Sequence, residues 1–378
     1  MLRNGGNDCP DHVMPYRGSH DLLDEAARRH DLGREQWLHA RFADSEQNLM
    51  AALAVREQFL GPHHETTIDT VERIAALRHY QLRGDDAGPL FDRVLNARRT
   101  AHGEDHPATA IALRNRGAWL RDSSLPTAGR DLDHAVEILQ RRLGADHPEL
   151  AAALKAQAFF AVAGHDRWRA LKLAERAHDA TYRCHGDDHP FTAGSLLIVA
   201  RAEAKAGGWR RARKQFSAVI AALNAAYGEQ HPLVALATDG LGDVQFADGD
   251  LAGAAVSWER ARATYARTYP RSPFGASLLI KLAQSALAAD DTEQALAFID
   301  EVCAIADAFP LAHRQLDGWL ASVASVAAGR ELIDTLRRVL DLADKYGGAE
   351  GEHQDTLVEL RALLNELDAI RRLRGVTR

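Results

Sequence analysis

The chain has 378 residues, of which 46% are apolar and 26% are charged, and its formal net charge is −7. This apolar content is sufficient for a hydrophobic core and excludes a chain that is disordered throughout. The mildly acidic balance argues against a general nucleic-acid binder, which normally carries a basic face, so no direct nucleic-acid contact is expected. The sequence has no apolar run of about eighteen residues, so no membrane span is expected either.

The cysteines and the first residues of the chain indicate the cellular compartment of the protein. Cys9, Cys184 and Cys303 are few and far apart, which favours a reducing cytoplasm over a disulfide framework. Residues 1–20 are polar and lack the apolar segment of a secretory signal, so we expect a disordered leader and a cytoplasmic protein. Arginine far outnumbers lysine and alanine is abundant, a composition typical of GC-rich bacterial coding sequences.

Residues 21–60 are expected to form N-terminal helices that include the first helix pair. Leu22, Leu23, Ala26 and Ala27 have helical spacing, and Leu32-Gly33 is expected to end that helix. Apolar residues between 37 and 59 then predict further helix before a Gly61-Pro62 turn.

A turn with the pattern Gly-x-x-His-Pro recurs along the middle of the chain. Clear copies occupy residues 102–109, 143–150, 185–192 and 227–234, and a degenerate copy occupies 60–67. Their glycines are residues 61, 103, 144, 186 and 228, which gives steps of 41 or 42 residues. A constant period of this length predicts a repeat array, which we assign to residues 61–309.

Backbone geometry explains why glycine and proline recur in these turns. Each glycine is expected to close a helix in the left-handed conformation, where the absence of a Cβ carries no penalty. Each proline is expected just inside the next helix, where its missing N–H is tolerated. The histidine directly before the proline is therefore expected to have a structural role in the turn, and each repeat is expected to be a helix pair.

A second pattern lies within each expected pair. Apolar residues at i, i+4 and i+7 of the second helix share one face. The first helix carries a small residue where its partner must approach closely, at Ala75, Gly117, Ala158, Ala200, Gly242 and Ala283. The second-helix trios are Ala87-Phe91-Val94, Ala128-Leu132-Ala135, Ala170-Ala174-Ala177, Ala212-Phe216-Val219, Ala254-Trp258-Ala261 and Ala295-Ile299-Val302.

The small residue followed by A-x-x-x-F-x-x-A resembles the tetratricopeptide repeat, and the 42-residue period with its G-x-D-H-P turn is similar to the longer repeat of kinesin light chains. The resemblance covers roughly residues 45–308 and implies an all-α, right-handed superhelical solenoid of antiparallel helix pairs. Kinesin light chain repeats usually carry an Asn-Asn pair on the first helix, and only Asn115 is present here. The architecture is therefore implied by the resemblance, whereas the ligand is not.

The end of the chain departs from the repeat. The turn at residues 269–273 lacks the glycine and histidine, yet a helix pair is still expected up to residue 309. Residues 310–378 are expected to hold a degenerate last pair and a C-terminal capping helix, because leucines from Leu357 to Leu373 gather on one side of it. The same helix could pair with a second copy as a short coiled coil, which leaves a homodimer possible.

The histidines raise the alternative of a metal site. His102 and His106 have H-x₃-H spacing, as do His185 and His189, and the second pair lies beside Cys184. The first histidine is replaced in the other copies of the turn, so a structural role is favoured, and no metal or cofactor is expected. Motifs for nucleophilic, phosphate-binding or zinc-dependent catalysis are absent from the sequence, so no enzyme is expected. Whether Cys184 is a reactive thiol or packs against the turn stays open.

The resemblance implies that the first helices line a concave groove, which in this family commonly holds an extended peptide or a partner helix. The groove positions are Glu72, Arg114, Arg121, Lys155, Arg201, Asp239, Asp243 and Gln284. A basic middle followed by an acidic stretch suits a peptide with an acidic segment or a C-terminal carboxylate. We expect a non-catalytic protein- or peptide-binding scaffold or adaptor. The alternatives are a peptide-sensing regulatory protein that acts through a partner and a substrate-recruiting subunit of an enzyme complex.

Overall fold

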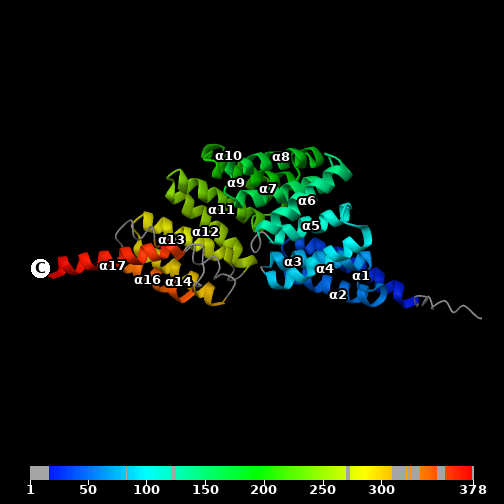
Figure 1. Ribbon diagram of the computed structural model, residues 1–378, viewed down its shortest axis with the longest axis horizontal. Helices are drawn as coiled ribbons and strands as arrows, with labels where there is room; N and C mark the ends of the chain where they lie inside the picture. Colours follow the sequence, from blue (N-terminus) through cyan, green and yellow to red (C-terminus); the bar gives the residue numbers. More distant parts are fainter. Residues whose placement is uncertain are drawn as a thin grey trace, which may run out of the picture. The chain divides into compact units, whose positions relative to one another are not determined.

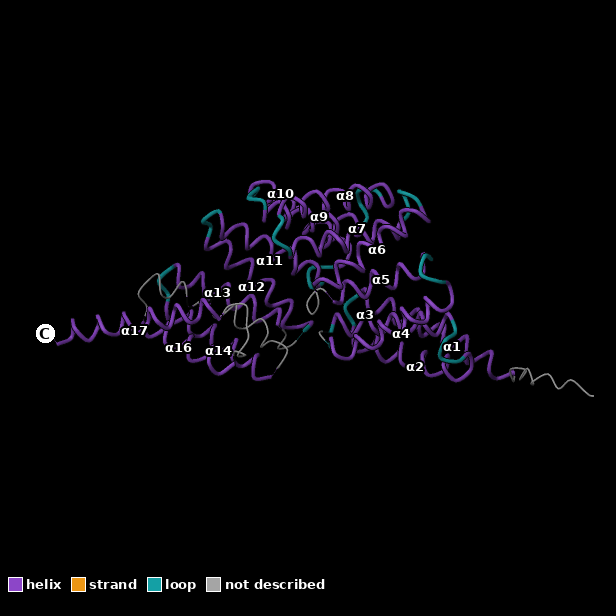
Figure 2. The backbone as a smooth tube through the Cα atoms, viewed as in Figure 1, coloured by secondary structure: helices purple, strands orange, loops and turns teal. Residues whose placement is uncertain are grey.

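A computed structural model describes residues 17–81, 83–120, 125–269, 273–308, 321, 324, 333–346 and 354–376. Its regular secondary structure in these ranges is entirely helical, which confirms the expected all-α fold (Figure 1, Figure 2). The helices are α1 (Arg17–Leu38), α2 (Phe42–Leu60), α3 (Glu65–Tyr80), α4 (Gly84–His102), α5 (Pro107–Leu120), α6 (Leu125–Leu143), α7 (Pro148–Ala163), α8 (Arg167–His185), α9 (Pro190–Lys205), α10 (Trp209–Tyr227), α11 (Pro232–Ala247), α12 (Leu251–Thr268), α13 (Pro273–Ala288), α14 (Thr292–Ala308), α16 (Ile333–Tyr346) and α17 (Gln354–Val376).

The chain divides into two compact units, Met1–Ala128 and Gly129–Arg378, and the division falls inside α6 and therefore inside the expected array. In unit 1 each helix from α1 to α4 packs on the next helix in the chain. In unit 2 the same holds from α7 to α14, and the first helices of successive pairs also touch, α7 with α9 and α9 with α11. This stacking of consecutive helix pairs is the solenoid that the repeat predicts.

The glycine of each turn has a positive φ, as expected, but its conformation differs from the prediction. Gly61 has φ 88° and ψ 165°, and Gly186 has φ 81° and ψ 179°. These values lie in the extended region at positive φ, which is essentially restricted to glycine, rather than in the left-handed helical region. Each glycine still closes its helix, because its backbone N–H donates to the carbonyl four residues earlier.

The turn histidines cap the helices that follow them. The Nδ1 atom of His147 accepts a hydrogen bond from the backbone N–H of Glu149 at 3.1 Å, and His189 does the same for Phe191 at 3.1 Å. Equivalent caps are formed by His64, His106 and His231. An N-cap acceptor satisfies one of the helix's unpaired donors. The structural role expected for this histidine is thereby confirmed.

The core follows the small-and-large pattern read from the sequence. Every second-helix trio is buried, and so are the small residues of the first helices. Gly242 shows why small residues are required: a Cβ added there would lie 2.5 Å from Nε1 of Trp258. At Gly240 an added Cβ would lie 2.4 Å from Cε1 of Phe216. The two glycines let α11 approach α12 on one side and α10 on the other.

The expected helix end at Gly33 is wrong. Helix α1 runs through Gly33 to Leu38, and it begins at Arg17, within the expected leader. A Cβ at Gly33 would lie 2.8 Å from Cγ of Leu49, and the Gly33 carbonyl accepts a 2.7 Å hydrogen bond from Ser45. The glycine therefore serves close packing of α1 on α2 instead of ending the helix.

The end of unit 2 is covered by apolar side chains of α17. Leu360 is buried in a cluster with Ile299, Val302 and Leu336, and Leu363, Leu364 and Leu367 pack against the same cluster. This packing supports the capping role predicted for the C-terminal helix. Most of the degenerate pair expected from residue 310 lies outside the described residues, as do residues 1–16 of the expected leader.

Candidate functional site

The first helices of unit 2 carry most of the predicted groove residues. Lys155 lies on α7, Arg201 on α9, Asp239 and Asp243 on α11, and Gln284 on α13. Contacts of α7 with α9 and of α9 with α11 bring these helices into one row. Each predicted side chain except Asp243, which is 48% exposed, is partly buried. We refer to this row of side chains as the first-helix surface.

Two cations of the first-helix surface lie over aromatic rings. The Lys155 ammonium is 5.1 Å from the ring centroid of Phe191, and the Arg201 guanidinium is 5.8 Å from that of Phe159. Cation–π contacts of this kind hold a cation in place over the ring. Among the described residues, Arg201 has no carboxylate within ion-pair distance. Its donors therefore remain available to a ligand.

The acidic residues of the surface are already matched by a lysine. The Lys281 ammonium on α13 lies 2.6 Å from Oδ1 of Asp239 and 2.6 Å from Oδ1 of Asp243. Trp258 on α12 donates from Nε1 to Asp243 at 3.2 Å, and the Lys281 ammonium is 5.9 Å from its ring. We call Asp239, Asp243, Lys281 and Trp258 the lysine cluster. Lys281 thus offsets one of the two negative charges of the acidic stretch that Asp239 and Asp243 form.

Burial shifts the pKa values of the charged groups in the lysine cluster. Burial acts against the charged form of Lys281, but the two carboxylates more than offset it, so the pKa of Lys281 is raised. Burial raises the pKa of Asp243, and Lys281 opposes only part of that shift. Burial, with Asp239 nearby, also raises the pKa of the buried Tyr265 well above its ordinary value. The cluster is a coupled charged group within the fold.

Unit 1 holds two of the predicted groove residues, in a smaller polar group of its own. Asn115 on α5 donates from Nδ2 to Glu72 on α3 at 2.6 Å. Arg114 donates from Nε to Oδ1 of Asn115 at 3.0 Å. Glu72 and Arg114 are thus joined through Asn115. The predicted groove residue Arg121 lies outside the described residues.

Three residues of the site escaped the sequence analysis: Lys281, Trp258 and Tyr265. Lys281 follows Asp239 by 42 residues, so the repeat period itself places it beside Asp239 on the next first helix. That signal was present in the sequence. It was missed because the groove positions were counted from the small residue, and Ala283 follows Gly242 by one residue fewer than the period.

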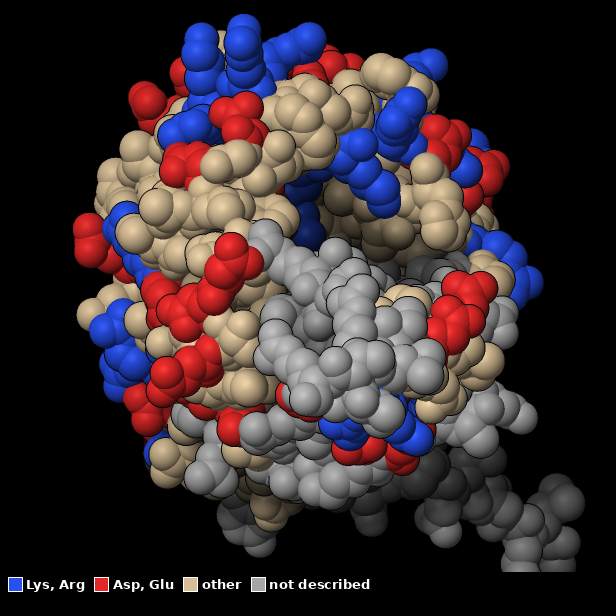
Figure 3. Space-filling view, turned by 90° about the vertical axis from the view of Figure 1, so that its left-hand side faces the viewer, with Lys and Arg blue, Asp and Glu red and all other residues tan. Residues whose placement is uncertain are grey.

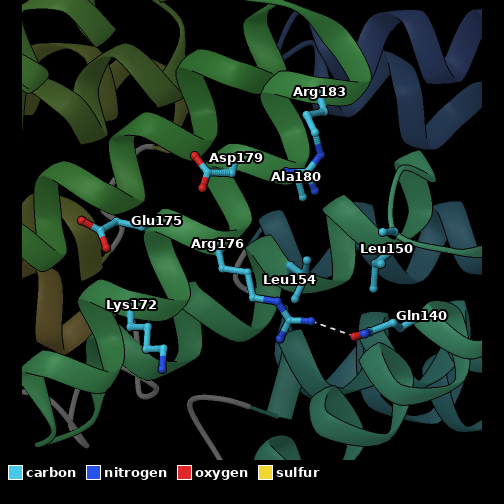
Figure 4. A pocket seen from close by; sticks show the side chains of 10 residues that line it. Gln140, Leu150, Leu154, Lys172, Glu175, Arg176, Asp179, Ala180 and Arg183 are labelled. Carbon is cyan, nitrogen blue, oxygen red and sulfur yellow. Dashed lines mark hydrogen bonds between the residues drawn. The ribbon is translucent and has the colours of Figure 1, made fainter.

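A cavity of about 310 Å³ lies away from the predicted groove positions, between α6, α7 and α8. Its charged lining includes Lys172, Glu175, Asp179 and Arg183 of α8. Figure 4 shows Arg176 reaching toward α6, where it donates to Gln140 at 2.7 Å. The lining carries both charges and is open to solvent, so it offers no selective chemistry of its own.

The histidine pairs of the turns are engaged with each other. The rings of His102 and His106 stack at 4.6 Å between centroids, and those of His185 and His189 at 4.7 Å. Within the described ranges, no group of three or more His, Cys, Asp or Glu side chains is placed to hold a metal ion. The Cys184 thiol lies 3.3 Å from the Asp146 carbonyl, and burial raises its pKa, which disfavours the reactive thiolate.

Charges of both signs are interspersed on the face drawn in Figure 3, with no single basic band across it. None of the helices in the described ranges has the unbroken apolar length that a membrane crossing requires.

Known proteins share this architecture. The sequence model of the tetratricopeptide repeat family matches residues 67–125, which contain α4, α5 and most of α3. Residues 67–125 are thus a tetratricopeptide repeat segment, within a fold of stacked helix pairs. The search of curated proteins found no match.

Solved structures resemble this chain along different shares of its length. The crystal structure of a Rap protein complexed with Competence and Sporulation Factor has a TM-score of 0.58 at 14% identity, over 93% of this chain and 94% of that one. Kinesin light chain TPR-like repeats from Podosopora anserina give a TM-score of 0.42 at 21% identity, over 54% of this chain and 98% of theirs. A tetratricopeptide repeat protein from Parabacteroides merdae has a TM-score of 0.42 at 14% identity, over 90% of this chain and 99% of that one.

Proposed function

We propose that this protein is a non-catalytic scaffold that binds an extended, acidic segment of a partner protein along the first-helix surface of unit 2. The observation that carries the proposal is Arg201. Its guanidinium is held against Phe159 and no carboxylate of the described residues pairs with it. An arginine kept in place by an aromatic ring retains a planar set of donors suited to a carboxylate.

The neighbouring lysine cluster supports the choice of an acidic ligand. Because Lys281 pairs with both Asp239 and Asp243 and offsets one of their two negative charges, these carboxylates compete less for Arg201 and repel an acidic ligand less than an unpaired pair would. Lys155 contributes a second positive charge one first helix away, on α7. A partner carboxylate would therefore meet a positive surface over α7 and α9.

The test is affinity purification of the full-length protein from its own host, beside a Lys155→Glu/Arg201→Glu variant. Reversal of two charges on partly exposed side chains should leave the core intact, and we expect it to remove the bound partner. The matched control is Arg141→Glu/Arg260→Glu, which reverses two cations that are 51% and 48% exposed elsewhere in unit 2. Retention of the partner by the first variant, or its loss from the control, would contradict the proposal.

A peptide-sensing role is the second candidate. The Rap protein that shares this fold along most of its length was solved with Competence and Sporulation Factor bound. A sensor of this kind should change its dimensions when a short peptide binds. Small-angle scattering with and without a short acidic peptide distinguishes the candidates, because a scaffold that is already formed should keep its radius of gyration.

A further inference from the structure

The first two turns of α8 and α10 have closely related sequences that no groove position explains. The six residues from 167 read Arg-Trp-Arg-Ala-Leu-Lys, and the six from 209 read Trp-Arg-Arg-Ala-Arg-Lys. The buried Ala170 and Ala212 fall at the same position in the two segments, one 42-residue repeat apart. Both helices thus expose a tryptophan and several cations at the same level of the solenoid. We name this the basic–aromatic surface, comprising Trp168, Arg169, Lys172, Trp209, Arg210 and Lys214.

The two halves of the basic–aromatic surface belong to one edge of unit 2. Lys205, at the end of α9, donates from its ammonium to the carbonyl of Val162 at 2.7 Å and also to the carbonyl of Gly164. These bonds join the turn before α8 to the turn before α10. Trp168 follows Gly164 by four residues, and Trp209 follows Lys205 by four. The two tryptophans therefore flank a single junction.

The tryptophans of this surface are exposed to an unusual degree. Trp168 is 61% exposed and Trp209 is 39% exposed, whereas Trp258, at the lysine cluster, is 2% exposed. The Arg167 guanidinium lies 5.6 Å from the ring centroid of Trp168. Large aromatic side chains and arginine are the residues that most often dominate the energy of protein interfaces. Leaving two of them in water indicates a surface that another molecule covers.

The cations of the surface lack internal partners. Within the described residues, no carboxylate pairs with Arg169, Lys172, Arg210 or Lys214, and all four side chains are exposed. Two nearby cations have carboxylate partners and are therefore not counted in the basic–aromatic surface. Arg211 pairs with the buried Glu203 at 2.9 Å, and Arg213 lies 3.4 Å from Asp250. Lys and Arg side chains gather at the top of Figure 3, the level at which α8 and α10 lie in Figure 1.

We propose that the basic–aromatic surface is a second interaction site, separate from the first-helix surface, which binds an acidic protein segment carrying aromatic or aliphatic side chains. Charge complementarity selects the acidic residues, and the two tryptophans select the apolar ones. A protein segment fits better than a polyphosphate chain or an anionic bilayer. Carboxylates at Glu175, Asp179, Asp248 and Asp250 border the surface, and a continuous anionic backbone would meet them, whereas a peptide places its charges only where cations lie.

The test uses the full-length protein and a fluorescein-labelled peptide of about 16 residues, long enough to cross two helices when extended, in which Asp and Glu alternate with Leu and Phe. Fluorescence anisotropy should show binding that weakens as salt is added. Trp168→Ala/Trp209→Ala should weaken binding at least tenfold, since hot-spot aromatic residues contribute that much or more. Arg169→Glu/Lys172→Glu/Arg210→Glu/Lys214→Glu should abolish it in a protein whose first-helix surface is disabled by Lys155→Glu/Arg201→Glu.

Controls separate this site from the first-helix surface and from other ligands. Because the first-helix surface is itself proposed to take acidic segments, Lys155→Glu/Arg201→Glu should remove any binding there and retain the binding that depends on Trp168 and Trp209. Arg141→Glu/Arg260→Glu should bind the peptide as the unmodified protein does. The proposal is overturned if the peptide does not bind, if the tryptophan variant binds it normally, or if the Lys155/Arg201 variant loses it. It is equally overturned if single-stranded oligothymidylate or phosphatidylserine vesicles bind more tightly than the peptide, since the surface would then serve nucleic acid or membrane.

Discussion

The lysine cluster and the basic–aromatic surface use the same residue types in opposite ways. In the lysine cluster, Lys281 holds two carboxylates and the buried Trp258 donates to one of them. In the basic–aromatic surface, the tryptophans lie in water and Lys172 and Lys214 have no carboxylate partner among the described residues. The difference lies in what the neighbouring repeat supplies. Lys281, one period from Asp239, contributes to folding, whereas Lys172 and Lys214, one period from each other, are left for binding.

The largest expected effect comes from Lys281→Met. The substitution leaves Asp239 and Asp243 close together without a counter-ion, and removing one partner of a buried pair costs about 3–5 kcal/mol. Because Lys281 is 23% exposed, we expect a loss nearer 2 kcal/mol, measured by urea unfolding of the full chain.

Lys214→Met is the matched control for that measurement. It also replaces a lysine by methionine, but at an exposed position of the basic–aromatic surface, so its effect should stay within about 0.5 kcal/mol. Equal destabilisation by the two substitutions would remove the distinction between the two regions.

Trp258→Phe tests whether the buried tryptophan of the lysine cluster contributes to stability where the exposed tryptophans of the basic–aromatic surface do not. It removes the Nε1 donor to Asp243 and part of a buried ring, for an expected cost of about 1.5 kcal/mol. Trp209→Phe, at the exposed tryptophan, should leave the free energy of unfolding unchanged within about 0.5 kcal/mol. A cost at Trp209 matching that at Trp258 would mean that the exposed ring serves folding.

The helix caps give a smaller effect. α11 of the lysine cluster is capped by His231, whereas α10 of the basic–aromatic surface follows Gly208, which provides no side-chain cap. His231→Ala should cost about 1 kcal/mol, and His231→Asn should restore much of it because asparagine also caps helices. Hydrogen exchange of the first amides of α11, compared with those of α10, is the measurement; unchanged exchange would argue against the cap.

The smallest effect concerns pH. Burial lowers the pKa of His178, on the inner side of α8, although Asp179 and Asp187 oppose the shift. The unfolded chain therefore binds this proton more readily, so stability is lost as pH falls below about 6.5 toward the folded pKa. His178→Gln should flatten this part of the stability–pH curve. The basic–aromatic surface contains no histidine, so peptide binding there should not follow the same curve while the fold holds.

The sequence was sufficient for the repeated parts of the fold and insufficient for the contacts between repeats. The turn histidines, the buried trios and the small residues of the first helices are all where their patterns predict, because each depends on residues close in the chain. Gly33 was misread because a glycine at the end of an apolar run has two uses, and only the position of Leu49 decides between them.

The candidate site was predicted less completely for a related reason. The positions that face the groove can be counted along one helix. Whether a charged side chain there is available to a ligand, however, depends on the residue that lies one repeat away. Asp239 and Asp243 were assigned to the ligand because Lys281 was not compared with them across the period. The two segments of the basic–aromatic surface align in the sequence one period apart, but they lie on second helices, outside the first helices to which the resemblance assigns the groove.

The histidine caps also have a spectroscopic consequence. A ring whose Nδ1 accepts a backbone hydrogen bond must carry its proton on Nε2 while it is neutral. Residues 64, 106, 147, 189 and 231 should then all show this tautomer in ¹⁵N spectra, one for each turn. The chain thus contains a native NMR probe in each of these five turns, able to report which of their repeats opens first.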